Sequence, residues 1–169
     1  MNAATALDDS VGAQFRATMR KFPATVTIVT AHDGKRDHGM TVTAVTSGSM
    51  SPPSLMVCLN NKTLLHEMLL SQANFAVNVL SHEHPEISDA FSGKVEPQQR
   101  FATGGWERDA DGMMVLPSAH ANVVCRRMAA VPYGTHTIFV GQVTRARVDD
   151  RTRPLLYAEA SYCTSQPAT

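Results

Sequence analysis

The chain has 169 residues, and its 15 basic and 15 acidic side chains give a formal net charge of zero. This length is typical of one domain with a real hydrophobic core, and the balanced charge argues against a nucleic-acid partner. A hydrophobic fraction of 43% is ordinary for a globular chain, and no apolar run approaches the ~20 residues of a membrane-spanning helix.

The N-terminal residues and the cysteines indicate the cellular compartment. The first ten residues, MNAATALDDS, contain acidic residues and lack the basic and apolar regions of a signal peptide. Cys58, Cys125 and Cys163 form no Cys-x-x-Cys pair, and an odd number of cysteines without a secretion signal is typical of reduced thiols. We therefore expect a cytoplasmic protein.

Taken in order, the chain is mostly strands. Apolar residues spaced three and four apart predict a helix over residues 11–21, which Pro23 ends. Short helices are expected over residues 63–70 and 85–91. Segments that alternate in polarity or are rich in β-branched residues predict strands at residues 24–31, 38–45, 55–59, 74–80, 121–131, 136–149 and 155–162.

Six or seven strands with few helices favour a mainly β fold, a closed or split antiparallel barrel. We expect residues 1–10 to form a flexible N-terminus, residues 11–163 a single domain and residues 164–169 a tail. A loop-like segment over residues 92–112 is long enough to suggest a function. No Gly-x-Gly-x-x-Gly follows a strand, so a nicotinamide nucleotide would not be held on a Rossmann domain.

The most informative stretch runs from His38 to Lys62. A strand leads into the hydroxyl-rich segment 46–49, which we interpret as a bend, and Ser51-Pro52-Pro53 then forms a stiff corner. An apolar strand and a helix start follow. This order suits a flat polar ligand with a phosphate tail, because backbone N–H groups and hydroxyls can line its edge and the helix start can take the anion.

The same stretch, GMTVTAVTSGSMSPPSLMVCLNNKT, resembles the short flavin reductases, the reductase components of two-component flavin monooxygenases. The resemblance extends from about residue 15 to residue 162, through Phe15-Arg16, Phe22-Pro23, FAVNVL at 75–80, Arg100-Phe101, Gly134-Thr135-His136 and PLLY at 154–157. It implies an FMN-binding split barrel of Greek-key order with a few peripheral helices, acting as a homodimer. It also implies that NADH or NADPH reduces FMN or FAD, and that a separate oxygenase receives the reduced flavin.

Carried onto this sequence, the resemblance implies two groups of flavin ligands. The ring would be held by Gly39, Met40, Thr41, Thr46, Ser47, Ser49, Ser51, Pro52 and Pro53. The phosphate end would be held by Asn60, Lys62, Thr63 and Arg100, with Phe101 beside them. Each has a plainer structural interpretation as well: a turn that satisfies its own backbone, a polar helix cap, or a surface charge.

His136 is the candidate catalytic residue, because the family histidine of a Gly-Asp-His motif lies near the nicotinamide. Here Thr135 replaces the acid, so any role that needs a carboxylate beside the imidazole is left open. His82, Glu83 and His84 have possible ligand spacing, but further ligands are not evident, and we expect no metal.

Alternatives remain at this point. The same residues suit a flavin-binding electron carrier or store, a reductase of another acceptor such as a corrin or an iron complex, or a split barrel of the pyridoxamine-phosphate oxidase kind. The choice between FMN and FAD, between NADH and NADPH, and of the partner oxygenase is also open.

Overall fold

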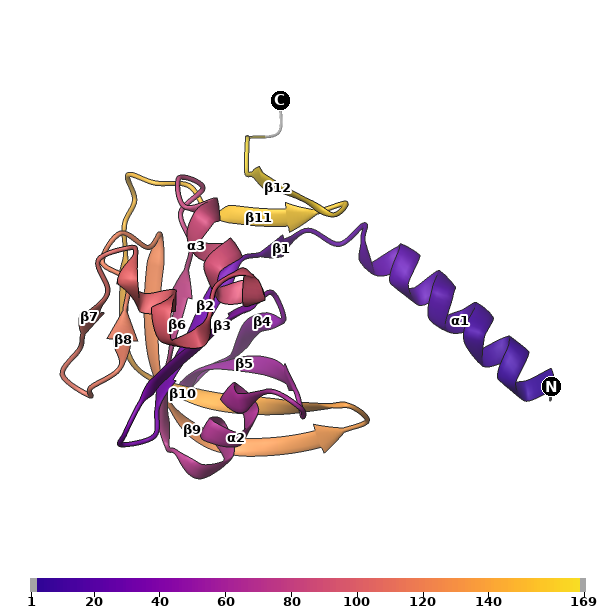
Figure 1. The fold of residues 1–169 in the computed structure, drawn as a ribbon, viewed down its shortest axis with the longest axis horizontal. Coiled ribbons are helices and arrows are strands. Elements are labelled where there is room, and N and C mark those ends of the chain that lie inside the picture. Colours follow the sequence, from indigo (N-terminus) through magenta and orange to yellow (C-terminus); the bar gives the residue numbers. More distant parts are fainter. Residues whose placement is uncertain (1–2, 168–169) are drawn as a thin grey trace.

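The computed structural model describes residues 3–167, and its main element is a seven-stranded antiparallel sheet with strand order β3-β2-β6-β9-β10-β5-β4 (Figure 1). The strands are β2 (Thr27–His32), β3 (Asp37–Val42), β4 (Val45–Met50), β5 (Pro53–Asn60), β6 (Asn74–Val79), β9 (Ala121–Tyr133) and β10 (His136–Val148).

The sheet curls into a barrel because of how its edges are connected. β3 and β4 lie at opposite edges of the sheet, yet Thr43 and Ala44 are the whole connection between them. The sheet must therefore bend until its edges meet, and the backbone N–H of Cys58 on β5 donates to the carbonyl of Ala44 at 2.9 Å. The predicted mainly β split barrel is thus confirmed.

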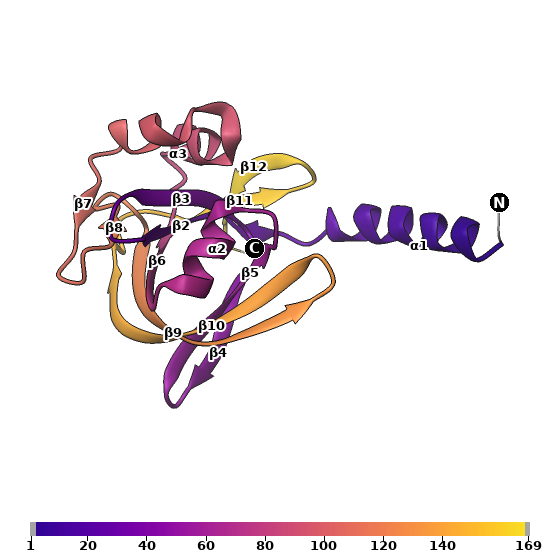
Figure 2. The ribbon, with the colours of Figure 1, turned by 60° about the horizontal axis from the view of Figure 1, so that its bottom comes forward.

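Alternation along the strands builds the core. Leu55, Val57 and Leu59 of β5 point inward and are buried, whereas the residues between them are partly exposed. Helix α2 (Leu64–Ser71) lies inside the curve of the sheet, as Figure 2 shows, and packs into the same apolar cluster. The outward-facing residues of β5 and β10 are therefore free to form a functional surface.

The remaining elements cover one end of the barrel. A three-stranded sheet contains β1 (Ala24–Thr25), β11 (Leu155–Ala158) and β12 (Ser161–Thr164). Helix α3 (Pro85–Asp89) runs directly into the π-helical turn η1 (Ala90–Lys94). The expected long loop, residues 92–112, contains a 3-10 helix, η2 (Pro97–Ala102), and the short strand β7 (Glu107–Arg108). Just beyond the loop, β8 (Met114–Val115) pairs with β7 to form a small hairpin.

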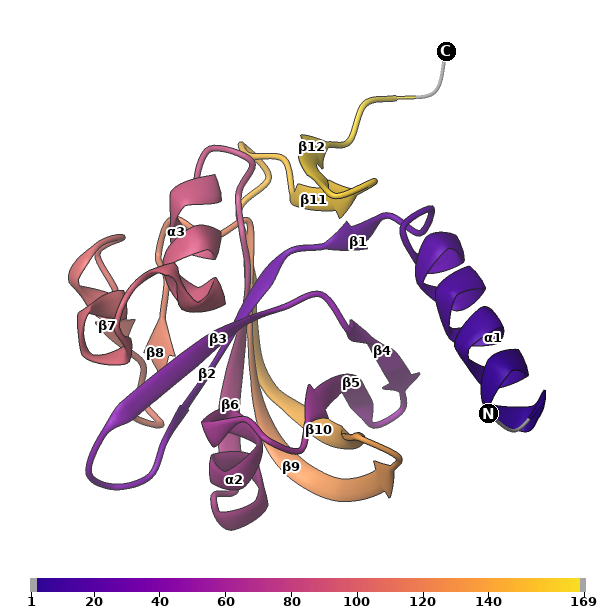
Figure 3. The same cartoon turned by 45° about the vertical axis from the view of Figure 1, so that its right-hand side comes forward.

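Helix α1 (Ala3–Met19) stands clear of the barrel in all three views (Figures 1–3). It begins earlier than the expected residue 11 and includes residues 3–10, which we predicted to be flexible. Val11, Phe15 and Met19 are exposed and spaced four residues apart, so they form one apolar stripe. In the described part of the chain, no helix is long and apolar enough to cross a membrane.

Two sequence predictions were wrong in detail. Residues 46–49 belong to edge strand β4, because the ladder with β5 outweighs the low strand propensity of small polar residues. The predicted single strand over 155–162 is a hairpin, whose turn residues Glu159 and Ala160 have φ of 49° and 63°. The pattern missed this turn because neither residue is the glycine or asparagine that usually adopts such angles.

Candidate functional site

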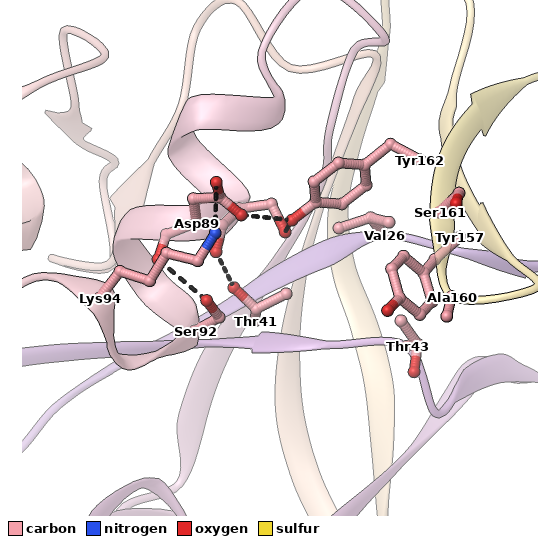
Figure 4. A pocket seen from close by; sticks show the side chains of 11 residues that line it. Val26, Thr41, Thr43, Asp89, Ser92, Lys94, Tyr157, Ala160, Ser161 and Tyr162 are labelled. Atoms are coloured by element: carbon pink, nitrogen blue, oxygen red, sulfur yellow. Dashed lines mark hydrogen bonds and ion pairs between the residues drawn. The ribbon is translucent and has the colours of Figure 1, made fainter.

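A pocket of about 540 Å³ lies where the chain leaves β3 (Figure 4). Its walls come from Thr41 and Thr43, from the α3–η1 segment and from the β11–β12 hairpin. The volume falls within the roughly 300–1,000 Å³ of small-molecule sites. The rings of Tyr157 and Tyr162 line it with centroids 5.6 Å apart, so it offers aromatic as well as polar surface.

A hydrogen-bond network joins the three walls, as Figure 4 shows. The Tyr162 hydroxyl lies 2.9 Å from Ser88 Oγ and 2.8 Å from Asp89 Oδ1. Lys94 Nζ donates to Asp89 Oδ2 at 2.7 Å, and Thr41 Oγ1 donates to the carbonyl of Ser88 at 2.7 Å. The C-terminal hairpin is therefore tied to α3, and α3 to the barrel.

The charges in the pocket are paired. The hydrogen bonds of Lys94 and then of Tyr162 lower the pKa of Asp89, and the Asp89 carboxylate in turn raises the pKa of Lys94. Burial raises the pKa of the Tyr162 phenol. At neutral pH the pocket therefore holds one carboxylate, one ammonium and a protonated phenol, a set that can contact both the polar edge and the phosphate of a nucleotide.

Thr43 connects this pocket to a second hollow of about 280 Å³, which Thr46, Cys58 and Ile138 also line. Ile138 pairs with Cys58 across β10 and β5, and the next outward-facing pair is His136 with Asn60. Since alternate residues of a strand share a face, the surface leads from the tyrosine pocket past Thr43 towards His136.

His136 is exposed at the start of β10, and Thr135 lies beside its ring. Thr135 Oγ1 is 2.9 Å from His136 Nδ1. The hydroxyl that replaces the family acid thus contacts the imidazole, although it carries no charge.

The predicted phosphate ligands meet at the start of α2. Thr63 caps this helix: its Oγ1 accepts from His66 N at 3.3 Å and donates to the carbonyl of Asn60 at 2.9 Å. Asn60 Oδ1 accepts from the backbone N–H of Lys62 at 2.9 Å. The capping interpretation therefore holds for Asn60 and Thr63, while Lys62 is exposed and presents an ammonium group at the helix N-terminus.

Other predicted ligands are engaged within the domain. Arg100 donates to the carbonyls of Val95 and Gly39 at 3.2 and 3.0 Å. Phe101 packs against Phe91 with ring centroids 5.1 Å apart. Gly39 is buried against the same Phe91 ring. Met40, partly buried, packs against the main core.

The β4–β5 turn lies apart from the tyrosine pocket. Ser49 Oγ donates to the carbonyl of Ser51 and accepts from its N–H, both at 3.1 Å, so it satisfies its own turn. Pro52 is exposed in this turn. Ser47 and Pro53 line a different, mostly apolar hollow of about 440 Å³. Of the predicted ring ligands, only Thr41 lines the tyrosine pocket, and Thr46 lines the adjoining hollow.

Sequence reasoning did not single out Ser88, Asp89, Lys94 or Tyr162 as site residues. Two tyrosines five residues apart in the last predicted strand were the available signal. A straight strand would place them on opposite faces, so only the hairpin turn brings them together. Among the described residues, no group of His, Cys, Asp and Glu is arranged to hold a metal ion.

Comparison with known proteins decides the family, since the flavin reductase like domain matches residues 19–166. The chain belongs to the flavin reductase family. It is 60% identical over 162 residues, 95% of this chain and 90% of the other, to the reductase component of an FADH(2)-dependent resorcinol hydroxylase from Rhizobium sp. (strain MTP-10005). The resemblance seen in the sequence and the predicted flavin reductase function are confirmed.

Solved flavin reductases share the fold. The Streptomyces globisporus NADH:FAD oxidoreductase SgcE6 superposes with a TM-score of 0.85 at 28% identity, covering 93% of this chain and 89% of that one. BorF, the flavin reductase component of a bacterial two-component tryptophan halogenase, gives a TM-score of 0.84 at 29% identity, covering 93% and 99%. The name of SgcE6 contains both kinds of predicted ligand, a nicotinamide nucleotide and a flavin.

Proposed function

We propose that this flavin reductase uses NADH to reduce FAD for a separate oxygenase that hydroxylates a small phenol. The observation that carries the proposal is the 60% identity, over nearly the whole of both chains, to a reductase component named for FADH(2) and resorcinol. The name NADH:FAD oxidoreductase of a solved structural neighbour supports the same pair of ligands. The two names together support FAD over FMN, and the second supports NADH over NADPH.

The surface described above fits a flavin and a nicotinamide together. The tyrosine pocket supplies rings, hydroxyls and a lysine, the hollow beyond Thr43 supplies an apolar wall, and His136 follows on the same face. The bound cofactors supply the chemistry, a hydride transfer from the nicotinamide to the flavin ring. The protein has to hold the rings in register and exclude water.

We assign His136 to the nicotinamide and Lys62 to a phosphate of the flavin. A lysine at a helix N-terminus acts as a point charge beside free N–H groups, which favours an anion. The Thr135 hydroxyl orients the imidazole through Nδ1, which leaves Nε2 to face the nucleotide.

We further propose a homodimer. The apolar stripe of α1, Val11, Phe15 and Met19, is between 44% and 63% exposed on a helix that stands away from its own barrel. The β9–β10 hairpin also exposes Met128, Val131 and Tyr133. A second subunit would cover such a surface, and twofold homodimers are the commonest assembly.

We propose that the protein works in the cytoplasm, where reduced nicotinamide nucleotides are available. Its three free thiols, Cys58, Cys125 and Cys163, would also stay reduced there.

Steady-state oxidation of NADH and of NADPH, with FAD, FMN or no flavin, tests the proposed reaction. Turnover should require added flavin, with the highest kcat/KM for NADH and FAD. Flavin binding without turnover would mean an electron carrier instead. Light scattering should give twice the chain mass of 18.3 kDa, and Phe15→Glu should shift the mass towards one chain; an unchanged dimer would place the interface elsewhere.

A further inference from the structure

Asn61 lies between two predicted phosphate ligands, but its contacts point to a different task. Its Nδ2 donates to the carbonyl of Gly134 at 3.3 Å, and its backbone N–H donates to the carbonyl of Thr135 at 3.0 Å. Its Oδ1 accepts from Thr137 Oγ1 at 2.9 Å. Asn61 therefore holds the chain immediately before and immediately after His136.

Thr137 connects Asn61 to a buried histidine. Thr137 and His66 are 3% and 8% exposed, and His66 Nε2 lies 2.9 Å from Thr137 Oγ1. The single proton of the Thr137 hydroxyl is already donated to Asn61 Oδ1. His66 Nε2 must therefore carry a proton and donate it to Thr137 Oγ1.

The hydrogen bonds run in one direction, from His66 through Thr137 to Asn61 and on to the carbonyl of Gly134. The His66 ring packs edge-on against Phe139, with centroids 5.5 Å apart, so it is fixed at its other side too. His66 Nδ1 is buried without a partner in the described part of the chain. Thr137 is therefore the one polar contact of the His66 ring, and loss of its hydroxyl would remove that contact together with one of the two side-chain hydrogen bonds of Asn61.

The network also joins two parts of the proposed site. Asn61 precedes the Thr63 cap of α2, and His66 lies in the first turn of that helix. The turn that carries Thr135 and His136 is thereby fastened to the helix start assigned to the phosphate. Gly134 has φ of +57°, a conformation that glycine adopts at little cost. Because glycine also adopts other conformations easily, contacts from outside the turn are needed to fix the position of the His136 imidazole.

We propose that Asn61 is a positioning residue for His136, held in place by Thr137 and His66. This inference rests on the proposed assignment of His136 to the nicotinamide. Asn61 itself need not touch either cofactor. A misplacement of about 1 Å at a reacting centre can lower a rate by up to roughly a hundredfold, so a tenfold to hundredfold effect is expected.

The experiment compares single and double variants. Asn61→Ala should lower kcat/KM for NADH by about ten- to a hundredfold, while the FAD dissociation constant stays within about twofold because no phosphate contact is lost. In a His136→Ala background, Asn61→Ala should have no further effect, since it acts through a side chain that is already absent. Multiplicative losses in the double variant would overturn the proposal.

Thr137 provides the matched controls. Thr137→Val removes the hydroxyl at nearly constant volume and should reproduce part of the fall in kcat/KM seen in Asn61→Ala. Thr137→Ser keeps the hydroxyl and should have the kcat/KM of the unchanged protein. Thr144→Val removes a hydroxyl of the same strand that donates to the carbonyl of Val124 at 3.1 Å, and should leave kcat/KM unchanged. Equal effects of Thr137→Val and Thr144→Val would mean a general loss of β10 stability.

The single variants separate two kinds of failure. Full activity of Asn61→Ala beside an impaired His136→Ala would refute the positioning role alone. Full activity of His136→Ala would remove His136 from the site, and with it both the proposed assignment and the role of Asn61.

Discussion

Gly39 offers a sharp test, because the family resemblance makes it a flavin contact and the structure makes it a packing position. A Cβ added at residue 39 would lie 2.6 Å and 2.9 Å from two carbons of the Phe91 ring and 3.3 Å from Thr30 Cγ2. Phe91 is 1% exposed and is packed against Phe101 and Trp106. The ring has little room to withdraw.

The expected cost follows from this contact. Inserting a methyl group into a well-packed core typically destabilises by about 1–3 kcal/mol, and a chain of this size loses roughly 2–4 °C of Tm per kcal/mol. Gly39→Ala should therefore lower the unfolding free energy by about 1–3 kcal/mol. Flavin affinity of the folded fraction should change little, since the added methyl faces the Phe91 ring.

Denaturant unfolding and flavin titration measure the two effects separately. Gly48→Ala is the control in the same stretch, because its nearest neighbour would be the flexible Ser54 Oγ at 3.2 Å, and it should change stability little. Phe91→Leu removes the ring edge that the added methyl group would contact. The double variant should therefore lose less unfolding free energy than the sum of the losses in Gly39→Ala and Phe91→Leu. Unchanged stability with weaker flavin binding in Gly39→Ala would refute the packing argument.

Three further predictions concern the charge, the pH dependence and the backbone of the site region. Lys62→Ala should weaken FAD binding by on the order of 1.5–3 kcal/mol and leave riboflavin binding unchanged; Lys35→Ala, in an exposed turn, should affect neither, and equal losses for both ligands would contradict the phosphate assignment. Burial, with the charge of Arg100 adding to it, lowers the pKa of His38 from 6.5 to about 4. The unfolded chain therefore binds a proton that the folded protein excludes, so the unfolding free energy should fall by up to about 1.4 kcal/mol per pH unit between these values as pH decreases, and a pH titration of His38→Gln should lack this slope. Ala160→Gly should raise the unfolding free energy by about 1 kcal/mol, because alanine is strained at φ of +63°; a lower Tm would show that the turn is not strained.

Local patterns predicted much of the fold. The continuous apolar run Leu55–Leu59 predicted a buried strand, and β5 buries Leu55, Val57 and Leu59, although Met56 and Cys58 between them are only half-buried. The polar residues before Leu64 predicted the start of α2, and Thr63 caps it. Edge strand β4 was missed because a run of small polar residues has no strand period, and only pairing with β5 orders it.

By itself, the sequence determined the strand-rich composition, the α2 start and the family, since these depend on neighbours within a few residues or on motifs in a fixed order. Tertiary structure alone decided which side chains share a site. Asp89 and Tyr162 are 73 residues apart and meet because the β11–β12 turn folds back onto α3. Thr137 reaches Asn61 across 76 residues because β10 pairs with β5. Such contacts are set by strand register and barrel closure, which carry no local signal in the chain.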